Sequence, residues 1–248
     1  VIPQPTYGMY TVSAEINQVD IKAPRLTAEF DLDLKTLENT WNDKSKLIFL
    51  CSPNNPSGNL LSAEKIKSVL RSFQGLVVVD EAYIDFTESA GFVPLLSEFP
   101  NLVILQTLSK AWGLAAIRLG MCFAHADIVA VLNKVKPPYN INILTQQVAE
   151  EALGQEERKN KWVAELIQER KKLAAELSKL PLVKTVYPSD ANFLLVQVND
   201  AKRIYHALVH TGIIVRDRSQ VVLCENCLRI TVGTVTENNL LIQALAQL

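Results

Sequence analysis

Three short apolar segments, separated by stretches of helical or loop character, constrain the fold of this chain most. They are KLIFLC (46–51), GLVVVDEAY (75–83) and NLVILQTLSK (101–110). Between the first two lies SAEKIKSVLRSF (62–73), which has the apolar spacing of an amphipathic helix and begins at Ser62, a favoured N-cap residue. Short strands that are apolar on both faces and alternate with helices are typical of a mostly parallel sheet. We therefore predict an α/β fold, with GMCFA (120–124) as a further strand.

The pattern changes after Pro137 and Pro138. Residues 143–153 and 156–180 have helical spacing, and the second of these segments is long and heavily charged. Further apolar and helical segments follow: TVYP (185–188), NFLLVQV (192–198), AKRIYHALVHTG (201–212), IIVRD (213–217), CLRITVG (227–233) and a last helix from Thr236. This order predicts a smaller α+β unit. We expect a large domain over residues 1–153 and a small C-terminal domain over residues 154–248.

The composition argues against several classes of protein. The chain has 248 residues and is 48% hydrophobic, which is enough for a buried core in one large domain or two smaller ones. Its 25 Lys and Arg residues nearly balance 26 Asp and Glu residues, so we expect neither a nucleic-acid partner nor a membrane partner. No apolar run reaches the roughly 20 residues that span a bilayer. Four cysteines are too few for a disulfide scaffold, so we expect a cytoplasmic location.

Polar residues gather where the predicted strands end. In open parallel sheets, ligands bind beyond the carboxyl ends of the strands. The polar residues at these ends are Asn54 and Asn55, then Asp80 and Tyr83, then Thr107, Ser109 and Lys110, with Arg118 eight residues further on. A single such ending means little, but several converging from successive strands predict a ligand site.

The residue types at these ends indicate which ligand binds there. A lysine at a strand end can form a Schiff base with a carbonyl group. Hydroxyl groups and an arginine are suited to a phosphate group. A carboxylate at the end of a buried strand can keep a pyridine nitrogen protonated. These three requirements together predict pyridoxal phosphate as the cofactor and give no reason to expect a metal.

Five motifs extend this interpretation to a family. They are PTYGMY (5–10), SPNNPSG (52–58), DEAYIDF (80–86), TLSKAWGLAAIRLG (107–120) and LRITVGT (228–234). Together they resemble the motifs of the fold type I aminotransferases, and their order is most similar to the histidinol-phosphate aminotransferase family. The resemblance covers essentially the whole chain. It implies the PLP-dependent transferase fold of type I, a mostly parallel sheet flanked by helices, with a smaller C-terminal α+β domain.

The resemblance also implies which residues hold the cofactor ring. Lys110 would bind pyridoxal phosphate as a Schiff base and later carry the substrate proton. Asp80 would pair with the pyridine nitrogen. Asn55 and Tyr83 would bind the phenolic oxygen, and Asn55 is also a candidate for contact with the substrate. Tyr7 would stack on the ring face.

The remaining implied roles concern anions. Thr107, Ser109 and Arg118 would hold the phosphate group of the cofactor. Arg229 would bind the carboxylate of glutamate. Arg216 would contact a second substrate anion, such as the phosphate of histidinol phosphate.

By resemblance, the reaction transfers an amino group between glutamate and imidazole acetol phosphate, and it forms histidinol phosphate in L-histidine biosynthesis. The small-molecule substrates would be a phosphorylated amine and glutamate, bound by a homodimer. Members of the family carry a further segment before PTYGMY, which contributes to the cofactor site. Because this chain opens at Val1 within VIPQPTYGMY, we expect that an N-terminal segment is missing.

Three alternatives remain open on the sequence. Threonine-phosphate decarboxylase is very similar and also binds a phosphorylated amine, and other relatives are aminotransferases for aromatic amino acids. The orientation of the bonds at the α-carbon would decide which bond breaks, and the residues on the substrate side would decide that orientation. A third alternative is a sensor domain of a transcription regulator, which would require a DNA-binding module before Val1.

Two patterns are better explained by structure than by chemistry. CENC (224–227) is a single Cys-x-x-Cys pair, whereas a zinc site would need two more ligands and a redox pair normally opens a helix. His206 and His210 are four residues apart, which suits a metal, but a solvated helix face is the simpler interpretation. We therefore expect no metal site.

Overall fold

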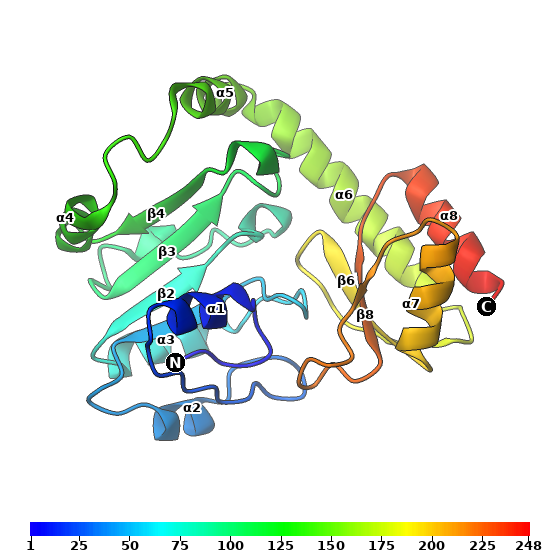
Figure 1. The fold of residues 1–248 in the computed structure, drawn as a ribbon, viewed down its shortest axis with the longest axis horizontal. Coiled ribbons are helices and arrows are strands. Elements are labelled where there is room, and N and C mark those ends of the chain that lie inside the picture. Colours follow the sequence, from blue (N-terminus) through cyan, green and yellow to red (C-terminus); the bar gives the residue numbers. More distant parts are fainter.

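The computed structural model describes residues 1–248 and contains two four-stranded sheets. The part up to residue 153 contains helices α1 (Met9–Ile16), α2 (Leu34–Thr40), α3 (Ala63–Ser72), α4 (Ala126–Val135) and α5 (Ile143–Leu153), strands β1 (Leu47–Cys51), β2 (Leu76–Asp80), β3 (Leu102–Thr107) and β4 (Gly120–Ala124), and short 3-10 helices η1 (Ile84–Phe86), η2 (Val93–Leu95) and η3 (Ala115–Ile117). The rest contains helices α6 (Glu156–Leu177), α7 (Ala201–His210) and α8 (Val235–Ala246) and strands β5 (Val183–Val186), β6 (Phe193–Val198), β7 (Arg216–Asp217) and β8 (Cys227–Thr231). Figure 1 shows the two sheets side by side, joined by α6.

The first sheet has the strand order β1-β2-β3-β4, with the first three strands parallel and β4 antiparallel to β3. The parallel register aligns Ile48 with Val77, and Val77 with Leu102, so their side chains form one row on the same face. This face packs against α3 through Ile66 and Val69 in a core cluster of 20 buried residues. Burial on the sheet explains why segment 62–73 is a helix with one apolar face, capped by Ser62.

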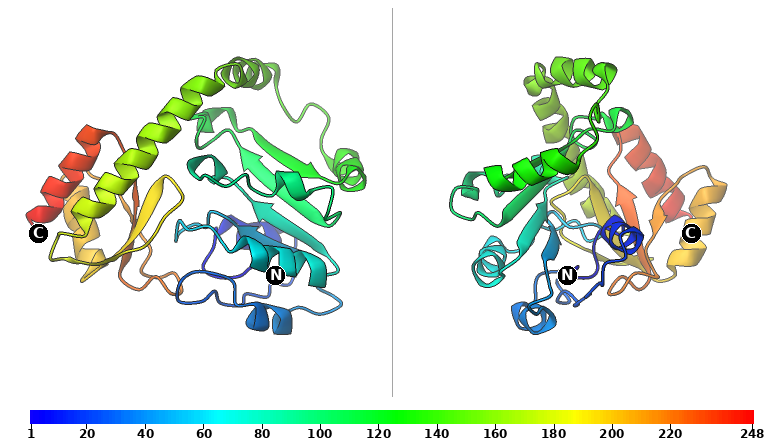
Figure 2. Two further views of the ribbon diagram at one scale, coloured as in Figure 1. Left: turned by 180° about the vertical axis from the view of Figure 1, so that it is seen from behind. Right: turned by 60° about the vertical axis from the view of Figure 1, so that its left-hand side comes forward.

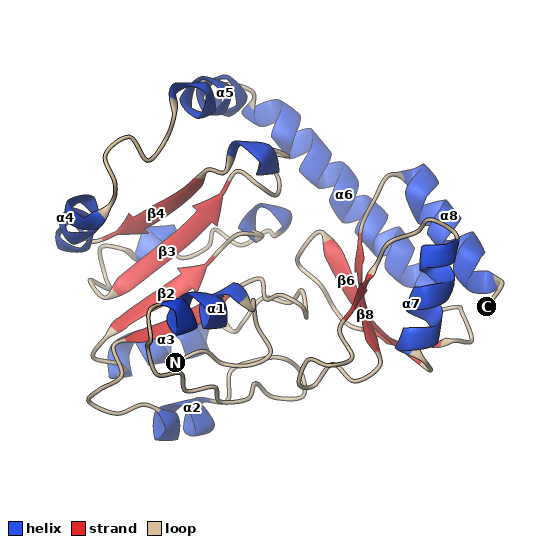
Figure 3. Ribbon diagram, in the orientation of Figure 1, coloured by secondary structure: helices blue, strands red, loops and turns tan.

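The second sheet has the order β5-β6-β8-β7 and is antiparallel throughout. Helices α7 and α8 and the C-terminal part of α6 lie against it, as Figure 3 shows. Leu173 and Leu177 of α6 are buried with Leu194 and Leu228 of the sheet. The second sheet therefore has a core of its own.

Helix α6 contacts both parts of the chain (Figure 2). Nearer its N-terminus, Val163 packs with Tyr83 and Ala111, which follow β2 and β3 of the first sheet. The Lys159 amine lies 2.9 Å from the Asp85 carboxylate and is only 9% exposed. Helix α6 thus packs against the second sheet and against the segments that follow β2 and β3 of the first.

The fold class predicted from the sequence is confirmed, including the mostly parallel sheet and the smaller part that combines helices with a second sheet. The helices predicted at 62–73 and 143–153 are confirmed within one residue, and α6 ends three residues before the predicted limit of 180. Within the segment IIVRD, only Arg216 and Asp217 form a strand, paired with β8. The domain boundary between residues 153 and 154 stays a proposal. No helix combines the length and apolar character needed to cross a bilayer.

Candidate active site

A cavity of about 480 Å³ lies beyond the carboxyl ends of β1, β2 and β3. Eight of the side chains predicted to form the site line it: Tyr7, Asn55, Asp80, Tyr83, Thr107, Ser109, Lys110 and Arg118. The other lining residues are Cys51, Ala82, Leu105, Gln106, Gly120, Met121 and Cys122. The volume is within the range of pockets for small molecules.

The strand register explains why these residues meet. Cys51, the last residue of β1, is aligned with Asp80, the last of β2, and Asp80 is aligned with Leu105 of β3. Strands β1 and β2 therefore end in register and β3 continues to Thr107, which places the loops that follow all three at one edge of the sheet. The antiparallel β4 begins at the same edge, because its first residue, Gly120, pairs with Thr107, the last residue of β3.

The two asparagines after β1 have different surroundings. Asn54 is 1% exposed, and its amide nitrogen donates to the Pro5 carbonyl (3.0 Å) and to the Ser57 hydroxyl (2.8 Å). Its amide oxygen accepts a hydrogen bond from the Thr6 hydroxyl at 3.1 Å. Asn54 therefore ties the loop to the N-terminal segment, while Asn55 faces the cavity.

Gly58 closes the same loop in a way that requires glycine. Its φ is +88°, and a Cβ atom there would lie 2.4 Å from the Ser189 hydroxyl oxygen. Its carbonyl accepts a 2.7 Å hydrogen bond from the Asp190 amide. The loop that carries Asn55 is thus held from both parts of the chain.

The Asp80 carboxylate is held at both oxygens. The Tyr10 hydroxyl donates to Oδ2 at 2.5 Å, and the Ala82 amide donates to Oδ1 at 3.0 Å. Burial raises the pKa of Asp80 above its ordinary value, while the bonds from Tyr10 and Ala82 and the charge of Lys110 oppose that rise. The site therefore holds a carboxylate in a poorly solvated place, where a cationic ligand group would be favoured.

Lys110 and Tyr83 lie together on the cavity wall. The Lys110 amine lies 5.1 Å from the centre of the Tyr83 ring, and that ring packs edge-on against Phe193 of β6 at 5.2 Å. Burial raises the pKa of Tyr83 to about 12, so its phenol stays protonated at neutral pH. The pair offers an amine and a hydrogen-bond donor to the same ligand.

Thr107, Ser109 and Arg118 form another side of the cavity. The Thr107 hydroxyl lies 2.9 Å from the Ser109 hydroxyl, and it accepts a 3.0 Å hydrogen bond from the Ser109 amide. Arg118 has a left-handed backbone conformation (φ 57°), and its guanidinium donates to the Ala115 carbonyl at 2.9 Å. Two hydroxyls and an exposed guanidinium make this side suitable for an anion.

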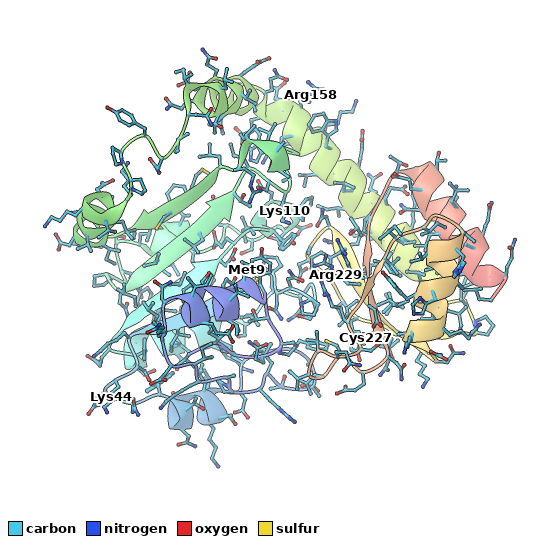
Figure 4. All side chains as sticks on the ribbon, viewed as in Figure 1. Met9, Lys44, Lys110, Arg158, Cys227 and Arg229 are labelled. Atoms are coloured by element: carbon cyan, nitrogen blue, oxygen red, sulfur yellow. The ribbon has the colours of Figure 1, made fainter.

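Arg229 reaches the site from the second sheet. Its Nη1 donates to the Asn55 oxygen at 2.7 Å, and its guanidinium lies 5.0 Å from the centre of the Phe193 ring. Its Nε is buried and has no hydrogen-bond partner within the chain. Figure 4 shows Arg229 and Lys110 near the junction of the two sheets. Arg229 thus retains an unused donor, as an anion-binding residue would.

Arg216 lies beside Arg229, and neither arginine is among the residues that line the cavity. The two residues are aligned in the register of β7 and β8, and Arg216 is exposed. Burial lowers the pKa of Arg229, and the charges of Arg218 and Arg216 act in the same direction. Arg216, Arg218 and Arg229 therefore form a cluster of cations on the second sheet, next to the site.

Tyr10 is the contact that sequence reasoning missed. The motif PTYGMY contains both Tyr7 and Tyr10, and only Tyr7 was assigned a role. Tyr10 is in α1, and Tyr7 lies two residues before that helix, where its carbonyl accepts a 3.2 Å hydrogen bond from the Tyr10 amide. The spacing of the two tyrosines within one motif is the signal that could have placed both rings together, although the bond to Asp80 depends on the tertiary fold.

The CENC pair lies away from the cavity. Cys224 and Cys227 are free and fully buried in the core of the first sheet. Burial raises the pKa of each thiol to about 12. Protonated, buried thiols act here as apolar packing groups.

A protein-family model described as aminotransferase class I and II matches residues 1–245. The chain is 56% identical over 241 residues to the histidinol-phosphate aminotransferase of Cytophaga hutchinsonii. That alignment covers 97% of this chain and 69% of the relative.

Two solved structures are similar to this fold. The histidinol-phosphate aminotransferase from Clostridium acetobutylicum superposes with a TM-score of 0.93 at 25% identity, over 99% of this chain and 76% of that one. The enzyme of that name from Sinorhizobium meliloti, solved in complex with pyridoxal-5'-phosphate, has a TM-score of 0.88 at 22% identity, over all of this chain and 69% of that one.

Proposed function

The chain belongs to the class I and II aminotransferase family, and we propose that it is a histidinol-phosphate aminotransferase that uses pyridoxal phosphate. It exchanges an amino group between histidinol phosphate and 2-oxoglutarate, giving imidazole acetol phosphate and glutamate, and runs in the opposite direction in L-histidine biosynthesis. The observation that carries the choice of substrate is the 56% identity over 97% of the chain to a relative of that name.

The donor set of the cavity fits this cofactor. Pyridoxal phosphate presents an aldehyde, a pyridine nitrogen, a phenolic oxygen and a phosphate group. The cavity offers an amine at Lys110, a carboxylate at Asp80 and a protonated phenol at Tyr83. The amide oxygen of Asn55 accepts a hydrogen bond from Arg229. The amide nitrogen of Asn55 is therefore left to donate to the phenolic oxygen of the cofactor.

The phosphate group would be held where Thr107, Ser109 and Arg118 line the cavity. Thr107 and Ser109 provide hydroxyl groups there, and Arg118 provides a cation. Tyr7 also lines the cavity and is 43% exposed, which leaves its ring free to cover the face of the cofactor. These assignments extend the roles implied by the sequence motifs.

The chemistry requires an electron sink, which the cofactor supplies when its pyridine nitrogen is protonated. Asp80 favours that protonation, since an ionised carboxylate stabilises a cation beside it. Lys110 would hold the cofactor aldehyde through Nζ, and as a free amine it would accept the proton from the substrate α-carbon at the same atom. The Tyr83 hydroxyl would donate a hydrogen bond to the phenolic oxygen of the cofactor. This bond would keep the reacting groups oriented.

The two arginines of the second sheet would bind the acidic groups of the substrates. Arg229 has a buried donor without a partner, which suits the carboxylate of glutamate. Arg216 is exposed on the neighbouring strand and is the candidate for the phosphate of histidinol phosphate.

The wider setting is proposed on separate grounds. The near balance of acidic and basic residues supports small-molecule substrates without nucleic-acid or membrane partners. Four free cysteines support a cytoplasmic location. A homodimer is proposed from the resemblance of the motifs to the family.

Product analysis tests the function. The protein is incubated with pyridoxal phosphate, histidinol phosphate and 2-oxoglutarate, and glutamate is quantified. We expect glutamate to form with histidinol phosphate at a higher kcat/KM than with phenylalanine as the donor. Release of carbon dioxide from threonine phosphate, without glutamate from histidinol phosphate, would show a decarboxylase instead.

A further inference from the structure

Tyr10 is a buried titratable residue to which the proposed reaction assigns no role. It lies in the first turn of α1 and is 8% exposed. Its ring stacks on Phe49 of β1, with the centroids 5.0 Å apart and the planes inclined by 25°. A buried phenol needs a hydrogen-bond partner, and the partner here is the Asp80 carboxylate.

The bond to Asp80 complements the bond from the backbone. Tyr10 donates to Oδ2 while the Ala82 amide donates to Oδ1, so the plane of the carboxylate is set by two donors on different elements. An ionised carboxylate has about four acceptor sites, so both bonds leave acceptor capacity for a ligand. Tyr10 thus restrains the direction in which Asp80 presents its free lone pairs.

Tyr10 also contacts the other group expected against the cofactor ring. Its ring meets the Tyr7 ring edge-on, with the centroids 5.5 Å apart and the planes at 87°. Tyr7 lines the cavity and Tyr10 does not. One buried side chain behind the wall therefore supports two cavity residues, one from the α1 segment and one from β2.

We propose that Tyr10 is a positioning residue, whose hydroxyl orients the Asp80 carboxylate toward the pyridine nitrogen and whose ring supports Tyr7. The inference rests on the proposed role of Asp80 in holding pyridoxal phosphate. A purely structural tyrosine would stabilise the fold equally whatever residue stood at position 80, whereas a positioning residue acts through the carboxylate.

A double-mutant cycle tests this distinction. Tyr10→Phe removes only the hydroxyl and keeps the stacking on Phe49. The dissociation constant of pyridoxal phosphate from the apoprotein is measured for the unaltered protein, Tyr10→Phe, Asp80→Asn and the double variant. Since a hydrogen bond to a charged group is involved, we expect Tyr10→Phe alone to weaken binding about 10-fold and to have little effect when Asp80 is already Asn.

Each other outcome has a defined meaning. If Tyr10→Phe weakens binding equally in both backgrounds, or not at all, the positioning role is overturned. If Asp80→Asn itself leaves binding and turnover unchanged, the proposed role of Asp80 fails instead. Tyr205→Phe is the matched control, because it makes the same change on α7, away from the cavity, and should leave binding unchanged.

A second measurement tests the proposal without the Tyr10→Phe variant, in case that variant does not fold. Fluorotyrosine is incorporated at position 10 alone, and its fluorine resonance is recorded in the apoprotein. We expect the resonance to shift when Asp80 is changed to Asn and to stay in place when the exposed Asp127 is changed to Asn. A resonance that does not respond to Asp80→Asn would overturn the proposal.

Discussion

Arg229 and Asn55, 174 positions apart in the chain, are joined by a 2.7 Å hydrogen bond between the guanidinium and the amide oxygen. Arg229 comes from β8 of the second sheet, and Asn55 follows β1 of the first. The bond fixes the amide so that its nitrogen remains for another partner. It also places a residue proposed to bind the substrate in direct contact with one proposed to bind the cofactor.

Replacement of Lys110 should abolish covalent attachment of the cofactor. In the unaltered protein, borohydride reduction followed by peptide mass spectrometry should find the cofactor on Lys110. Lys110→Ala should lose this label and about 10³-fold or more in turnover, because both the covalent bond and the proton acceptor are removed. Lys134→Ala, a change in α4, is the control and should keep the label. A label on another lysine of the unaltered protein would refute the assignment.

Arg229→Ala should weaken the binding of glutamate. Loss of a charge-assisted bond to a carboxylate predicts a rise of about 10-fold or more in the KM for glutamate. Steady-state kinetics with varied glutamate measure this change. Arg203→Ala, on α7, should leave the KM unchanged. If the KM for glutamate does not rise in Arg229→Ala, the carboxylate binds elsewhere.

The neighbouring asparagines should respond differently to the same substitution. Asn54→Ala removes the partner of the Pro5 carbonyl and of two hydroxyls, so the free energy of unfolding should fall by about 2–3 kcal/mol. Asn55→Ala should cost less stability and should weaken the affinity for pyridoxal phosphate. Urea unfolding of the apoprotein and a cofactor titration measure the two effects. Equal losses of stability with unchanged affinity would contradict the separation of roles.

The Tyr83 phenol should contribute to the pH dependence of stability. Its pKa is raised from 10.0 to about 12, so the folded state holds this proton more tightly than the unfolded state. The contribution is fully present below pH 10 and is lost as the pH rises toward 12, a difference of about 3 kcal/mol. Urea unfolding of the apoprotein between pH 9 and 12 should therefore show a steeper loss for the unaltered protein than for Tyr83→Phe. Parallel curves would show that the phenol titrates normally.

The sequence predicted the elements whose pattern is local. Segment 62–73 shows its apolar face and its cap directly, and it is a helix over Ala63–Ser72. The antiparallel direction of β4 could not be predicted, since GMCFA has the same apolar character as a parallel strand. The strand at Arg216 is short because its extent depends on pairing with β8, which no local pattern encodes.

The candidate site was predictable where residues follow strands. Asp80 and Lys110 stand at strand ends, and both line the cavity. The distinction between Asn54 and Asn55 was not predictable, because it depends on the contact of Asn54 with Pro5. Tyr10 was missed for the same reason, since its bond to Asp80 spans 70 positions of the chain.

The most direct test is an absorbance titration of the protein loaded with pyridoxal phosphate. Glutamate is added to one sample and histidinol phosphate to another, each without a keto acid. The proposed function predicts that either amine removes the yellow absorbance of the lysine-bound cofactor and that 2-oxoglutarate then restores it. Absorbance that persists with both amines would contradict the assignment of this chain as a histidinol-phosphate aminotransferase.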